Sequence, residues 1–120
     1  MSAVSFQAYT ERIFLLIAMR ENVGELQEIV NAAVAEVLAQ CREDADRSDR
    51  RLCWLAAALA NLRWRQMIAA QGAVSPTAAG CVPRDRDDSA PCSFAERLYH
   101  DYRDAAASLL RDDSFLFERV

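Results

Sequence analysis

The chain has 120 residues, of which 52% are hydrophobic, and its 18 acidic and 14 basic residues give a net charge of -4. This length and composition predict one folded domain with its own core and argue against a disordered chain. The acidic balance also argues against a general nucleic-acid-binding protein, which would present a basic face.

Targeting signals and cysteine usage predict where the protein is made. Residues 1–12 lack a basic stretch ahead of an apolar run, so no signal peptide is expected. The apolar run at residues 13–18 is too short to span a bilayer, so no membrane association is expected. The four cysteines show no C-x-x-C spacing, which favours free thiols and production in the cytosol.

The first two helices are predicted from apolar residues at three- and four-residue steps. One helix is expected over residues 5–19, with Ser5 as a possible cap. The second is expected over residues 23–42, because Asn22 is followed three residues later by Glu25, the pattern of a capping box. The outward side of the second helix is acidic and is therefore expected in solvent.

The longest strongly apolar segment predicts a third helix over residues 49–71. Its apolar residues cover most of the helix circumference, which is typical of a helix packed on several sides. We therefore expect the other helices to pack on it. The charged break before it offers three possible caps, Asp46, Ser48 and Asp49. Because this break is short, the two helices it joins are expected to run antiparallel.

A long loop is predicted over residues 72–92, which contain all three prolines. Loops of about 20 residues are uncommon in compact domains and are typically functional or disordered. Arg84 and Arg86 lie in a mixed-charge run of this loop. Such a run is either a solvated loop or a segment that reaches a neighbouring subunit.

The last helix is predicted over residues 93–111, opened by a capping box of Ser93 and Glu96, with Phe94 on its apolar face. Residues 114–120 then form a tail that is apolar for a chain end. Chain ends fray unless something holds them, so the tail is expected to dock on its own core or on a partner.

Together these elements predict a single all-α domain over residues 1–120, a small bundle of about four helices with a long Pro-rich loop before the last helix. No catalytic, cofactor or metal site is predicted, and the chain is not expected to be an enzyme. His100 has Asp101 beside it and Asp104 four residues on, a pattern that could orient a base. No nucleophile lies nearby in the sequence, so a surface histidine is the simpler interpretation.

The four cysteines are spaced too widely for the paired ligands of a structural zinc site. Cys41 and Cys53 fall on apolar helix faces, where cysteine acts as a small hydrophobic residue. Cys81 and Cys92 flank part of the Pro-rich loop, and a disulfide that closes it is the alternative.

Trp64 lies between Arg63 and Arg65, an alternation that could contact phosphates and bases. In an acidic chain this pattern more readily places Trp64 at a protein interface. The loop arginines and the apolar tail supply the other interface candidates. The predicted interface residues are Trp64, Arg84, Arg86, Phe115 and Phe117.

The order of elements resembles a known family. An acidic amphipathic helix (ELQEIVNAAVAEVLAQC) leads through a short polar break to a helix rich in Leu and Ala (RLCWLAAALANLRWRQMIAAQG). A loop, a final helix and an apolar end (FAERLYHDYRDAAASLLRDDSFLFERV) follow. Over about residues 23–120 this pattern is similar to the small head–tail connector, or adaptor, proteins of tailed bacteriophages and prophages. In many of these proteins the loop forms extended strands, whereas here it is Pro-rich.

The resemblance implies a structural protein of three or four helices that assembles into a homo-oligomeric ring below the portal. Such a ring extends the DNA channel, seats the next neck protein and touches DNA only non-specifically. It implies the portal and neighbouring neck or tail proteins as partners, first in the bacterial host cytoplasm and then in the virion neck. Deleting residues 114–120 is expected to leave the helices folded and to abolish assembly. The alternative is a helical regulatory or partner-binding module that acts as a dimer.

Overall fold

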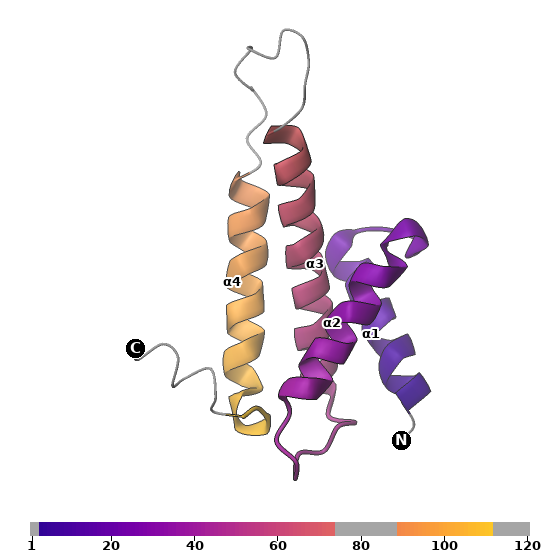
Figure 1. The fold of residues 1–120 in the computed structure, drawn as a ribbon, viewed down its shortest axis with the longest axis vertical. Helices are drawn as coiled ribbons and strands as arrows, with labels where there is room; N and C mark the ends of the chain where they lie inside the picture. Colours follow the sequence, from indigo (N-terminus) through magenta and orange to yellow (C-terminus); the bar gives the residue numbers. More distant parts are fainter. Residues whose placement is uncertain (1–2, 74–88, 112–120) are drawn as a thin grey trace, which may run out of the picture.

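The computed structural model describes residues 3–73 and 89–111, and all the elements in this part of the chain are helical. The predicted all-α bundle is confirmed (Figure 1). Two short 3-10 helices, η1 and η3, accompany the α-helices. The elements in chain order are α1 (Ala3–Ala18), η1 (Gly24–Leu26), α2 (Gln27–Gln40), α3 (Arg50–Ala73), α4 (Ser89–Ala105) and η3 (Ala107–Leu109).

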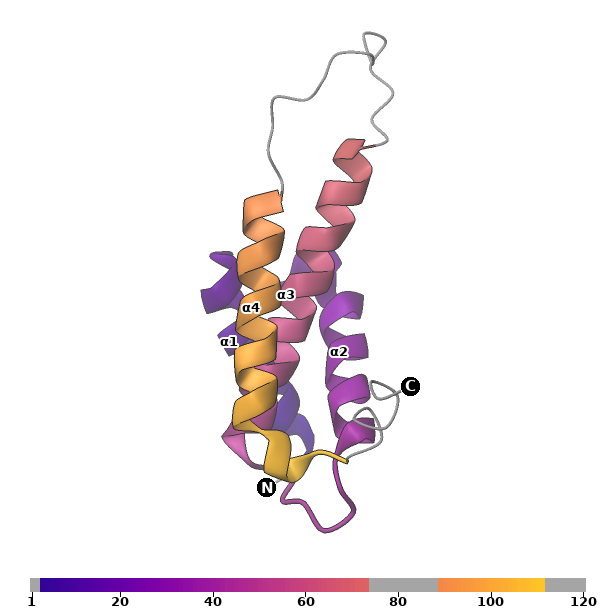
Figure 2. The same cartoon turned by 90° about the vertical axis from the view of Figure 1, so that its left-hand side faces the viewer.

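Helix α3 is the centre of the bundle, as predicted. Helices α1, α2 and α4 all pack against it, and α3 and α4 run side by side for much of their length (Figures 1 and 2). Between Leu52 and Leu62 every residue of α3 is buried except Trp54, which is half-buried. Four of these residues are alanines, and small side chains let neighbouring helices approach closely. The largest fully buried side chains around them include Phe14, Val30, Val37, Leu52 and Leu55.

Helix α1 ends in a left-handed residue that is not glycine. Met19 has φ 59, and it follows the last helical residue of α1. The N–H of Arg20 donates to the carbonyl of Leu15 at 3.0 Å, and that of Met19 donates to Leu16 at 3.3 Å. This pair of bonds is the Schellman motif, in which glycine is the favoured residue at the left-handed position.

Replacing Met19 with glycine is expected to raise the free energy of unfolding by about 0.5–1 kcal/mol, because glycine removes the strain of a positive φ. The side chain itself is 88% exposed, so its loss removes little packing. Urea unfolding measures the difference. Met19→Ala keeps the strain and also removes the side chain, so it should give no gain. Equal stabilisation by both substitutions would contradict this explanation.

Helix α2 does not begin with the predicted capping box, so the box of Asn22 and Glu25 is wrong. The chain passes through η1 first, without a side-chain cap, and α2 starts at Gln27. Gly24 has φ +53, and an added Cβ there would lie 3.0 Å from the Asn22 Oδ1 atom. A left-handed residue cannot continue a regular first turn. Glu25 instead lies 3.7 Å from the Arg20 guanidinium.

Helix α3 is capped by Asp49, one of the three predicted candidates. The backbone N–H of Arg51 donates to Asp49 Oδ1 at 2.9 Å, and the Arg51 guanidinium donates to Asp49 Oδ2 at 2.9 Å. Asp46 accepts hydrogen bonds from the backbone N–H and hydroxyl of Ser48, so this pair shapes the turn before the helix. The short charged break therefore supplies both the turn and the cap.

Replacing Asp49 with alanine is expected to lower the free energy of unfolding by about 1 kcal/mol at neutral pH, the usual loss for a missing N-cap. The hydrogen bond from Arg51 lowers the pKa of Asp49 from its ordinary value of 3.8. The stabilisation that comes from the charge is therefore present above pH 3.8 and is lost as the pH falls through the lower folded-state value.

Urea unfolding of the two proteins at neutral pH and in acid measures this linkage. The difference between wild type and Asp49→Ala should shrink in acid. Glu43→Ala, an exposed change in the same break, should have little effect at either pH. A difference for Asp49→Ala that keeps its size in acid would contradict a charged cap.

Helix α4 begins at Ser89, four residues before the predicted start, so the capping box of Ser93 and Glu96 is wrong. Pro91 is the third residue of the helix, where no N–H is needed for the first turn, so it does not interrupt the helix. Helix α4 ends at Ala105, earlier than predicted, and η3 follows.

The last described residues are tied to the end of α2 at the base of the bundle. The N–H of Arg42 donates to the carbonyl of Leu109, and the N–H of Arg111 donates to Gln40, both at 2.9 Å. These bonds form an isolated antiparallel bridge between Cys41 and Leu110. The bridge ties the end of α2 to the segment after α4. The proposed tail, residues 114–120, and most of the Pro-rich loop lie outside the described residues.

Candidate interaction surface

Helix α3 continues well past the last residue that the core buries. Leu62 is its last buried residue up to Gly72, and eleven residues remain from Leu62 to the end of the helix at Ala73, a length of about 16 Å. Figures 1 and 2 show the ends of α3 and α4 projecting as a pair beyond α1 and α2. We call residues 63–72 of α3 and 91–97 of α4 the distal hairpin. Within it only Ala95 is buried.

The distal hairpin exposes large apolar side chains. Phe94 is 68% exposed and Met67 is 40% exposed. Ile68 and Ala69 are half-buried. Helix ends with so little buried surface gain little packing energy, because most helical stability in proteins comes from tertiary contacts. The distal hairpin is therefore a candidate contact surface, as is the end of α1, where Leu16 and Met19 are 70% and 88% exposed.

Trp64 lies at the root of the distal hairpin and is half-buried. Its ring meets the ring of Phe14 edge-on, with centroids 6.4 Å apart. The Arg65 guanidinium lies 4.6 Å from the indole centroid and that of Arg20 lies 5.6 Å from it, both within cation–π range. Trp64 thus packs α1 against α3 and leaves only part of its surface for a partner.

The arginines beside Trp64 do not form a row of unpaired positive charges that could contact a nucleic acid. Arg63 lies 2.7 Å from Glu36 of α2, so its charge is paired. The guanidinium groups of Arg20 and Arg65 make cation–π contacts with the Trp64 ring, as described above. This arrangement favours the protein-interface interpretation of Trp64 over nucleic-acid binding.

The other predicted interface residues, Arg84, Arg86, Phe115 and Phe117, lie outside the described residues. The sequence pattern placed Phe94 on the apolar face of the last helix, yet it is exposed. Leu16 on α1 follows the same helical spacing and is also exposed. Helical spacing shows that residues share one face of a helix, but it does not show whether another helix covers that face at each residue.

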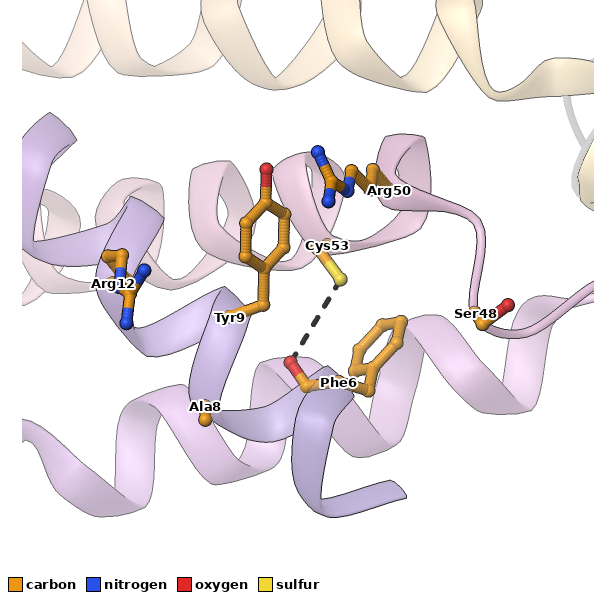
Figure 3. A pocket seen from close by; sticks show the side chains of 7 residues that line it. All are labelled: Phe6, Ala8, Tyr9, Arg12, Ser48, Arg50 and Cys53. Carbon is orange, nitrogen blue, oxygen red and sulfur yellow. Dashed lines mark hydrogen bonds between the residues drawn. The ribbon is translucent and has the colours of Figure 1, made fainter. Parts of the chain in front are cut away.

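A pocket of about 290 Å³ lies between the first half of α1 and the start of α3 (Figure 3). Its lining combines buried apolar side chains with two arginines. The Cys53 thiol lies 3.9 Å from the carbonyl oxygen of Phe6, and the Arg50 guanidinium lies 5.0 Å from the Tyr9 ring centroid. The lining residues are Phe6, Ala8, Tyr9, Arg12, Ser48, Arg50 and Cys53.

The chemistry of this pocket favours binding over catalysis. Burial raises the pKa of the Cys53 thiol, so the sulfur is protonated at neutral pH and is a weak nucleophile. The apolar floor and cationic rim suit an apolar group that carries a negative charge. Sequence reasoning missed this pocket, because Arg12 and Arg50 lie on different elements and only the fold brings them to one cavity.

The remaining chemical candidates lie apart from one another. His100 is exposed on α4, its ring 5.4 Å from that of Tyr99. Cys41 and Cys53 are buried free thiols, as predicted, and Cys92 is a free thiol that donates to the carbonyl of Arg65 at 3.4 Å. The described residues contain no group of three or more side chains that could hold a metal ion.

None of the helices, over the residues that the structure describes, is long and apolar enough to cross a membrane. Comparisons with protein-family models, with curated protein sequences and with solved structures found no match to this chain. The function therefore has to be inferred from the chain's own geometry and sequence pattern.

Proposed function

We propose that this protein is a structural assembly subunit of the phage or prophage head–tail connector kind, which forms a homo-oligomeric ring below a portal. In this role the ring extends a DNA channel and seats the next neck protein. The observation that carries the proposal is the distal hairpin, a projection of two helices that the core of the subunit does not support.

The packing of the distal hairpin supports assembly rather than a monomeric role. Its exposed Phe94 and Met67 side chains would lose solvent contact against a neighbour, and burying a large apolar side chain contributes about 1.5–3 kcal/mol. Aromatic and Met side chains are enriched in protein interfaces, so these two residues are the expected centre of an interface on the distal hairpin. The projecting shape lets one subunit reach another without moving its core.

Sequence pattern and charge support the connector class in particular. The order of helices, the long loop and the apolar tail resemble those of head–tail connectors, as described above. The net charge of -4 suits a channel wall that DNA must slide past, because like charge disfavours tight phosphate contacts.

The test is the mass of the full chain by light scattering across a concentration series. The proposal expects a closed oligomer larger than a dimer or tetramer, or a monomer that joins a ring when a portal ring is added. A monomer that no portal ring recruits would contradict the proposal. A dimer at all concentrations would favour the alternative, a helical regulatory or partner-binding module.

A further inference from the structure

The pocket between α1 and α3 has an apolar floor and a cationic rim. Phe6 and Cys53 are buried beneath it, and the Tyr9 ring is half-buried. In Figure 3 the Tyr9 ring stands between the side chains of Arg12 and Arg50. Both arginines are exposed, so their charges are accessible from solvent.

Neither rim arginine has a carboxylate partner among the residues that the structure describes. Arg50 lies over the Tyr9 ring, and neither Arg12 nor Arg50 forms an ion pair in that part of the chain. Other described arginines do form ion pairs, namely Arg20, Arg42, Arg51 and Arg63. In an acidic chain, two guanidinium groups left on one pocket favour an acidic occupant.

The size of the pocket limits what it can hold. A volume of about 290 Å³ is at the lower limit for small-molecule sites. One aromatic side chain with a carboxylate nearby matches this size and the lining. The chain itself contains a segment of this chemistry in residues 112–120, with the acids Asp112, Asp113 and Glu118 and the aromatics Phe115 and Phe117.

The segment starts at a fixed place close to the same end of the bundle. Arg111 is held on the end of α2, because its backbone N–H donates to Gln40 and its guanidinium donates to Ala39 at 2.6 Å. Residues at the start of α3 line the pocket, and the start of α3 lies at the same end of the bundle as the end of α4 (Figure 1). Nine extended residues span up to about 30 Å, enough to reach an adjacent copy.

We propose that this pocket binds one phenylalanine of residues 112–120 from a neighbouring copy, with Arg12 and Arg50 paired to the acids that flank it. This inference rests on the proposed function, because in a ring each subunit binds one neighbour through one surface and the other neighbour through a different surface. A tail placed in the next subunit's pocket is such a head-to-tail contact, and it closes a ring when the rotation allows.

The test mixes two full-length variants. The pocket variant carries Arg12→Glu and Arg50→Glu, and the tail variant carries Phe115→Asp and Phe117→Asp. Each variant alone should be a monomer in light scattering. The mixture should form a one-to-one pair, because it contains one intact pocket and one intact tail. A control with Arg42→Glu and Arg47→Glu makes the same charge change at exposed positions outside both the pocket and the distal hairpin, and it should assemble like wild type.

A second measurement uses a fluorescent synthetic peptide of residues 112–120. It should bind the full-length tail variant, and adding the two pocket substitutions should raise its Kd about tenfold or more. No binding of the peptide would overturn the proposal. Binding of the peptide without pairing in the mixture would indicate docking within one chain and would also overturn it. Circular dichroism checks that the exposed substitutions leave the helices intact.

The outcomes separate this inference from the proposed function. If the pocket variant forms the same oligomer as wild type, the tail contact is wrong, while the connector role stands. If wild type forms no ring alone or with a portal ring, the connector role is wrong. Peptide binding and pairing of the two variants then still decide whether the pocket receives the tail of another copy.

Discussion

Replacing Phe14 with alanine is expected to lower the free energy of unfolding by about 3–5 kcal/mol. Phe14 is fully buried, and its ring contacts that of Trp64 where α1 meets α3. The substitution removes this apolar surface and leaves a cavity that the helices fill only in part. Since small domains have about 5–15 kcal/mol of stability in total, a large part of it would be lost.

Urea unfolding followed by circular dichroism measures the effect of Phe14→Ala. Leu16→Ala, two residues along the same helix, is the matched control, because Leu16 is 70% exposed and should lose little. Comparable losses for the two variants would mean that the packing of α1 on α3 described above is wrong.

Replacing Met67 and Phe94 together with glutamate is expected to weaken the proposed self-association by about a hundredfold or more, because an interface would then have to bury two unpaired charges. Both side chains are exposed in the subunit, so the helical content and the unfolding midpoint should change little. Light scattering across a concentration series should show the assembly converted to monomers.

The neighbouring polar residues provide a control with the same added charge. Gln66 and Ser93 are exposed on the same two helices, directly beside the apolar pair. Gln66→Glu with Ser93→Glu should leave the assembly intact if the apolar contacts carry it. Dissociation by both double substitutions would show that the assembly depends on the charge of this region and not on the Met67 and Phe94 contacts. No effect of either would remove the distal hairpin as the interface.

The sequence predicted the helices well because apolar periodicity is a strong signal. Residues 52–60 are apolar all round the helix, and only a central helix can bury such a surface. The errors lie at the helix starts. The Asn22 and Ser93 patterns match capping boxes, but a left-handed Gly24 and a tolerated Pro91 move both starts. Local backbone geometry decides such positions, and residue spacing does not encode it.

The candidate surfaces were harder to predict than the fold. The exposure of Phe94 depends on which side of α4 faces α3, the helix that α4 packs against, and this is a tertiary property. The pocket likewise depends on the crossing of α1 and α3, which brings together Arg12 and Arg50 from distant parts of the chain. The sequence shows Arg63 and Arg65 beside Trp64, but Phe14 and Arg20 reach its ring only through the fold, and its role at an interface stays a prediction.

The distribution of buried residues along α3 implies a gradient of local stability. Amides from Leu52 to Leu62 lie in the core and should exchange hydrogen with solvent only when the whole domain unfolds. Amides beyond Arg65 should exchange through local opening of the two projecting helix ends. In the proposed assembly, part of the free energy of binding would then be used to order the distal hairpin. The contact between two subunits would therefore be weak and reversible until further subunits join the assembly.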